Sequence, residues 1–127
     1  MSNVSRIASS KRVVIKVGSS SITGENESQL DLIVDLAVRL MRDKEVILVS
    51  SGAIATAAPL IGLTVKSEDL ATSQALAAIG QAKLMSRYER SLSRHNLMPG
   101  QILLTVDNLD EENTSENALR ALERLLE

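Results

Sequence analysis

The sequence predicts an α/β fold in which a parallel sheet carries helices on both faces. Strand-like runs alternate with helix-like runs along the chain. The strand-like runs are apolar throughout, with no alternation of apolar and polar residues. Continuous apolar strands joined by helices are typical of parallel sheets that are buried on both faces. We therefore expect a three-layer α/β/α sandwich.

Three segments are predicted to be strands. Residues 12–17 (RVVIKV) and 45–50 (EVILVS) are rich in β-branched and aliphatic side chains. Residues 100–105 (GQILLT) form a third apolar run, directly after a proline. Such short apolar runs, bounded by glycine, proline and serine, favour strands. All three should be parallel and central in the sheet.

Three longer segments are predicted to be helices, over residues 28–44, 67–96 and 115–127. The first has apolar residues at helical spacing, and Ser28 with Asp31 fits a capping box. The first ten residues are small and polar, so we expect a flexible N-terminus over 1–10 and a domain over 11–127.

The composition excludes several classes of function. The net charge is −2, which argues against a nucleic-acid surface, and the absence of cysteine excludes disulfides and thiolate metal sites. His95 is the single histidine, so neither a histidine-based metal site nor a Ser-His-Asp triad is expected. No apolar run approaches the roughly 18 residues of a membrane span. We expect no metal site, no membrane contact and a cytoplasmic location.

Two predicted strands end in small, hydroxyl-rich turns. Lys16 and the 18–20 turn close the first strand, and the 51–53 turn follows the second. Ligands of open parallel sheets bind at the carboxyl ends of strands, where small residues let backbone N–H groups approach an anion. The lysine precedes the glycine, so this is not a Walker A loop. An anion site is one interpretation, and a solvated lysine beside a serine-rich turn is the other.

Four motifs, in this order and spacing, resemble the amino acid kinase family. They are VVIKVGSSSITG, VILVSSGAIA, SQALAAIGQAKLMSRYE and PGQILLT, and the resemblance covers nearly all of residues 11–127. The SSGAIA and AAIGQ segments together are closest to the branch that phosphorylates glutamate, and less close to the carbamate, uridylate and aspartate kinases.

The resemblance implies an activity and a set of site residues. The activity is ATP-dependent phosphorylation of the γ-carboxylate of L-glutamate to γ-glutamyl phosphate, the first step of proline biosynthesis, with Mg²⁺ accompanying ATP. By this resemblance Lys16 is the catalytic residue beside the transferred phosphoryl group. ATP or phosphate would bind Lys16, Gly18, Ser19 and Ser20, and glutamate would bind Ser51, Gly52 and Ala53. A half-domain also leaves part of its sheet edge and helix faces uncovered, and this apolar surface leads us to expect a homo-oligomer.

The sequence departs from the family in four respects. Ala57 stands where glycine is usual, Ser73 where lysine is frequent, and Leu119 where arginine is usual. The family also continues into a region that completes the ATP site. Residues 11–127 therefore resemble the N-terminal, amino-acid-binding part, truncated before the ATP-binding part, and we expect the 127-residue chain to be inactive alone. The alternatives are an aspartate, acetylglutamate or carbamate type of kinase, or a non-catalytic fragment that binds an anion or a partner.

Overall fold

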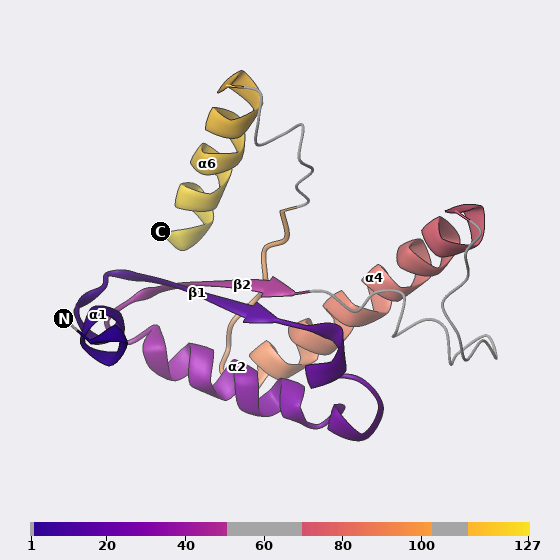
Figure 1. Cartoon of the computed structure of the whole chain (residues 1–127), viewed down its shortest axis with the longest axis horizontal. Helices are drawn as coiled ribbons and strands as arrows, with labels where there is room; N and C mark the ends of the chain where they lie inside the picture. The colour runs from indigo at the N-terminus through magenta and orange to yellow at the C-terminus, as the bar shows by residue number, and fades with distance from the viewer. Residues whose placement is uncertain (1, 51–69, 103–111) are drawn as a thin grey trace.

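Helices and strands alternate over residues 3–50, and two further described helices follow. A computed structural model describes residues 2–50, 70–102 and 112–127, shown in Figure 1. The described helices and strands are α1 (Asn3–Ser9), β1 (Arg12–Val17), α2 (Gln29–Leu40), β2 (Glu45–Ser50), α4 (Leu70–Ser93) and α6 (Glu112–Leu126). Two single-turn 3₁₀ helices, η1 (Ser19–Ser21) and η2 (Gly24–Asn26), lie between β1 and α2.

The two described strands form a parallel pair. Arg12 lies opposite Glu45, and the register runs to Val17 opposite Ser50, so both strands end at the same level. This pairing and the flanking helices confirm the predicted parallel α/β class. The third predicted strand is not confirmed: residues 100–102 are not in a strand, and 103–105 lie outside the described residues.

One face of the sheet carries the core. Ile15, Val17 and Leu48 pack in one core cluster with residues of α2 and α4. Both helices lie on this side of the sheet (Figure 1). The core cluster on that side consists of Val17, Ile22, Leu30, Val34, Leu84 and Tyr88, each no more than 5% exposed. We call this side the covered face. The alternation of side chains along a strand places Val14, Lys16 and Val49 on the opposite side, which we call the open face.

α6 lies on the side of the open face (Figure 1). A Cβ atom built on Gly100 would come within 2.7 Å of Leu125 Cδ2, so α6 packs closely against the chain at that glycine. A cavity of about 400 Å³ lies nearby, with Val49, Met85 and Leu122 among its lining residues. Helices therefore lie on both sides of the sheet, as the predicted sandwich requires.

The predicted capping box at the start of α2 is wrong. Ser28 has helical backbone angles (φ −68°, ψ −17°), whereas a capping residue is extended, and its side chain makes no capping bond. Asp31 instead accepts a hydrogen bond from Ser91 Oγ on α4 at 2.6 Å. The Asp31 side chain therefore links α2 to α4 instead of capping its own helix.

The N-terminal segment, expected to be flexible, contains α1 over Asn3–Ser9. Ser2 caps this helix by accepting a hydrogen bond from the Ser5 N–H. Lys44, just before β2, donates through Nζ to the carbonyls of Ala8 at 3.0 Å and Ser10 at 2.7 Å. These contacts hold the end of α1 against the start of the sheet.

Candidate functional site

Lys16 is the last residue but one of β1 and lies on the open face. It is exposed and lies opposite Val49 in the strand register. Within residues 2–50, 70–102 and 112–127, no group hydrogen-bonds or ion-pairs with its ammonium. Arg12, at the other end of the same face, pairs with Glu45 at 2.8 Å. The carboxyl end of β1 therefore carries a cation that the described protein does not neutralise.

The turn after β1 directs its carbonyls into internal hydrogen bonds. The Ser19 carbonyl accepts from the Thr23 hydroxyl at 2.7 Å, and the Ser20 carbonyl accepts from the Asn26 amide at 2.8 Å. The Gly18 carbonyl accepts from the Ser21 N–H at 3.1 Å. The N–H groups of Ser19 and Ser20 donate to no carbonyl in the described parts of the chain. The free backbone groups that this turn offers a ligand are therefore the N–H donors of Ser19 and Ser20.

Gly18 leaves open space at this turn. Its φ of −75° is available to any residue, so the backbone does not require glycine here. A Cβ atom placed on it would meet no atom within 4 Å. Neither conformation nor packing among the described residues explains the glycine, whereas a ligand approaching the turn would use the space. Gly24, by contrast, has φ +60°, which favours glycine on conformational grounds.

The structure brings together the predicted residues of the first turn: Lys16, Gly18, Ser19 and Ser20. Ser51, Gly52 and Ala53 lie outside the described residues. Because Val17 pairs with Ser50, the chain leaves β1 and β2 at neighbouring points of one sheet edge. The register therefore satisfies the first requirement for a site shared by the two turns.

Sequence reasoning missed two residues that contact the ends of this region. Tyr88 of α4 is 5% exposed, and its hydroxyl lies 2.8 Å from Ser50 Oγ. Burial raises the pKa of Tyr88, partly opposed by its hydrogen bond with Ser50. Arg87 donates through Nη2 to the carbonyls of Ile22 at 2.8 Å and Glu27 at 3.0 Å. Both residues belong to the LMSRYE run of α4. Their spacing in the sequence is that of any helix, so it does not distinguish them from residues that only pack in the core.

The sequence profile of the amino acid kinase family matches residues 11–127. The chain belongs to the amino acid kinase family. Its relatives include proteins named glutamate 5-kinase from Clavibacter sepedonicus, 53% identical over 121 residues, and Leifsonia xyli subsp. xyli (strain CTCB07), 50% identical over 123 residues. A third, from Thermobifida fusca (strain YX), is 48% identical over 126 residues.

These relatives are longer than the matched part. The alignments cover 94%, 96% and 95% of this chain, but 47%, 46% and 32% of the three relatives in the same order. The chain therefore spans about a third to a half of the length of these amino acid kinase relatives.

Two of the sequence departures from the family can be placed in the structure. Leu119, where the family usually has arginine, lies on α6 and is 49% exposed. An exposed position accommodates either side chain, so this departure does not disturb the core. Ser73 lies in the first turn of α4 and is half-buried. Ala57 lies outside the described residues.

The remaining charged cluster joins α2 to α4. Asp35 accepts hydrogen bonds from Arg94 at 2.9 Å and lies 2.8 Å from His95 Nε2. The hydrogen bond from His95 is the main cause that lowers the pKa of Asp35, with Arg94 adding to it.

The part of the chain that the structure describes has no group of three or more acidic, histidine or cysteine side chains that would hold a metal ion. Nor is any described helix long and apolar enough to cross a membrane.

Proposed function

We propose that this chain forms the glutamate- and phosphate-binding part of a glutamate 5-kinase. The observation that carries the proposal is the exposed Lys16 ammonium, without a described partner, beside a turn whose Ser19 and Ser20 N–H groups are also free of carbonyl partners. The names of the relatives suggest glutamate as the substrate. The residues of the site give a chemical reason for this assignment.

The reaction brings two anions together. An oxygen of the glutamate γ-carboxylate attacks the γ-phosphorus of ATP, the bond between that phosphorus and the β,γ-bridging oxygen breaks, and γ-glutamyl phosphate and ADP result. Phosphoryl transfer depends chiefly on positioning and on neutralising charge. Lys16 and the amides of the 18–20 turn would offset the repulsion between carboxylate and phosphate. Mg²⁺ would enter with the nucleotide, whose phosphates it bridges.

The second turn completes the proposed assignment. Ser51, Gly52 and Ala53 would bind glutamate, because they follow the strand that ends beside Lys16. On this proposal residues 11–127 form the amino-acid-binding part of a kinase domain, and the main ATP-binding residues belong to the rest of that domain. The step would be the first of proline biosynthesis. We also propose that the chain forms a homo-oligomer, because Val14 and Val49 leave apolar area exposed on the open face.

A chimeric enzyme tests this function. Residues 11–127 would replace the matching part of the Clavibacter sepedonicus relative, to which the chain is 53% identical. We expect glutamate-dependent formation of ADP by the chimera and none by the 127-residue chain alone. Aspartate, N-acetylglutamate and carbamate serve as competing substrates, and each should give much less ADP than glutamate. A folded chimera without glutamate-dependent turnover, or with a preference for another acceptor, would contradict the proposal.

A further inference from the structure

Two adjacent residues of α4 contact the segment after β1 and the last residue of β2. Arg87 bonds to the segment after β1, and Tyr88 bonds to the last residue of β2. Neighbouring residues on a helix point in directions about 100° apart, so one helix turn can reach two different segments. α4 lies against α2 and the covered face, as Figure 1 shows, and it is therefore fixed relative to the sheet.

Arg87 holds the whole segment between β1 and α2 through two hydrogen bonds. Its Nη2 atom bridges the carbonyls of Ile22 and Glu27, which lie just before and just after η2. Thr23 and Asn26, between these two carbonyls, donate to the carbonyls of Ser19 and Ser20. The contacts run without a break from α4 through η2 to the 18–20 turn. A shift of Arg87 would therefore be transmitted to the turn beside Lys16.

Tyr88 fastens the end of β2. Its ring belongs to the core cluster, and its hydroxyl meets Ser50 Oγ at 2.8 Å. Since burial raises its pKa, the phenol stays protonated at neutral pH and keeps a proton for this contact. Ser50 is the residue directly before the 51–53 segment, so the hydroxyl contact fixes the point from which that segment starts.

We propose that Arg87 and Tyr88 are positioning residues that fix the separation between the 18–20 turn and Ser50, the last residue of β2. The proposal rests on the proposed function, because it takes the 18–20 turn to hold phosphate and the 51–53 turn to hold glutamate. The two substrates react only when the carboxylate and the γ-phosphate lie at attack distance. A misplacement of about 1 Å can cost on the order of 10²-fold in rate.

The kinetic test uses the chimeric enzyme with conservative variants. Arg87→Met keeps an unbranched apolar stem and removes both hydrogen bonds, and Tyr88→Phe removes only the hydroxyl. Each should lower kcat by about 10-fold or more, with the KM values for glutamate and ATP changed by less than about 3-fold. Arg90→Met is the matched control, because Arg90 lies one turn further along α4 and its side chain bonds to no described residue. It should keep the parent kcat.

The double variant adds a sharper criterion. If both residues fix the same separation, either single variant already disturbs it. The fold-decrease in kcat of the double variant should therefore be smaller than the product of the two single fold-decreases. Arg87→Lys should give an intermediate kcat, because an ammonium on a shorter side chain replaces the Nη2 group that donates to the two carbonyls. Losses that appear only in KM, or kcat values equal to that of the Arg90 variant, would overturn the proposal.

A second measurement does not depend on catalysis. Amide hydrogen exchange at Ser21 and Ile22 reports the bonds that these N–H groups make to the carbonyls of Gly18 and Ser19. In Arg87→Met both amides should exchange about 10-fold faster than in Arg90→Met, while the β1 amides stay protected. If exchange accelerates but no variant or parent shows kinase activity, the proposed function fails and the positioning contact stands. Unchanged exchange at both amides would overturn the positioning role itself.

Discussion

The two faces of the sheet carry similar side chains in different surroundings. Val17 on the covered face is 3% exposed, whereas Val14, three residues earlier on the open face, is 59% exposed. The covered face packs against α2 and α4, and the open face holds Lys16 at its carboxyl end. The comparison indicates that one face supplies stability, while the other leaves a charged group accessible. A strand can do both because its side chains alternate.

The helices on the two sides differ in the same way. Leu84 of α4 is 1% exposed, whereas Leu119 and Leu125 of α6 are 49% and 56% exposed. α6 therefore covers the open side only in part within the described residues. The apolar stripe of this helix adds to the apolar area that Val14 and Val49 expose, which is the area that the proposed homo-oligomer would use.

The largest difference between the faces should appear in stability. Val17→Ala removes two methyl groups from the core and should lower the free energy of unfolding by about 2 kcal/mol. Val14→Ala makes the same chemical change on the open face and should cost less than about 1 kcal/mol, since Val14 is mostly exposed. Urea unfolding followed by circular dichroism measures both. Equal losses would show that the open face is packed as tightly as the covered one.

Much of this arrangement could be predicted from the sequence. Apolar continuity gave the positions of β1 and β2 and their parallel pairing, and periodicity gave α2, α4 and α6. The sequence did not predict which face of each strand is covered. In residues 13–17 every side chain except Lys16 is apolar, so both faces of β1 look alike. The sequence also predicted a capping box of Ser28 and Asp31, but Ser28 has helical backbone angles and Asp31 accepts a hydrogen bond from Ser91 of α4.

The candidate site was predictable only in part. Lys16 and the 18–20 turn stand out because a cation and small residues follow an apolar run. Arg87 and Tyr88 act through contacts with residues 22, 27 and 50, which are 38 to 65 positions away in the sequence. Local pattern carries no information on such distant pairs, since the same residues on any helix would read as packing or solvent-exposed positions.

A smaller effect on the covered side should depend on pH. Because the pKa of Asp35 is lowered below its ordinary value of 3.8, its contribution to stability is present above that value and lost as the pH falls through the lowered pKa. The charged groups around Asp35 are Arg94 and His95, which directly follow α4, and Asp31 of its own helix. Asp35→Asn should therefore reduce the loss of stability between about pH 5 and pH 2.

Asp43→Asn is the control for this pH effect, because its carboxylate pairs with no group in the described residues. Thermal melting at a series of pH values compares the two variants with the parent. A steeper acid dependence in the Asp35 variant than in the parent would contradict the assigned role of the His95 and Arg94 contacts.

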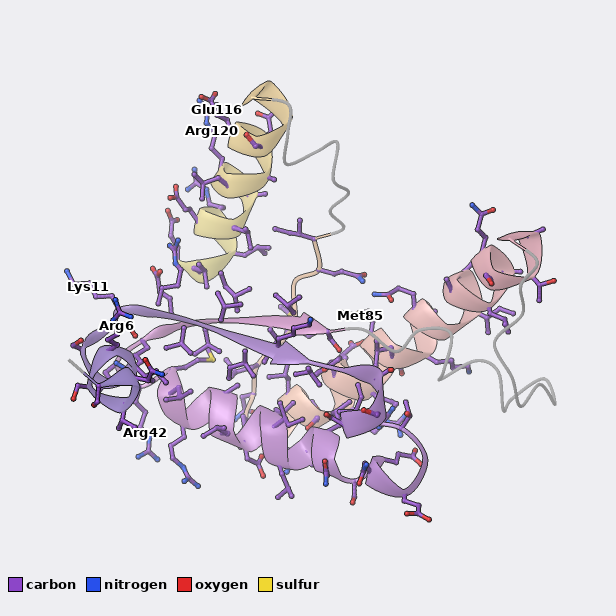
Figure 2. All side chains as sticks on the ribbon, viewed as in Figure 1. Arg6, Lys11, Arg42, Met85, Glu116 and Arg120 are labelled. Carbon is purple, nitrogen blue, oxygen red and sulfur yellow. The ribbon has the colours of Figure 1, made fainter. Side chains whose placement is uncertain are left out.

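The kcat of Lys16→Met in the chimeric enzyme tests most directly the claim that the open face carries the chemistry. The matched control is Lys11→Met: Lys11 lies just before the opposite end of β1 and points away from the protein in Figure 2. Loss of one preorganised charge at the transferred phosphoryl group typically costs on the order of 10²-fold. We therefore predict that Lys16→Met lowers kcat by at least about 10²-fold, with a much smaller change in the glutamate KM, while Lys11→Met keeps the parent kcat. A Lys16 variant with the kcat of the Lys11 variant would show that Lys16 is a solvated lysine without a role in catalysis.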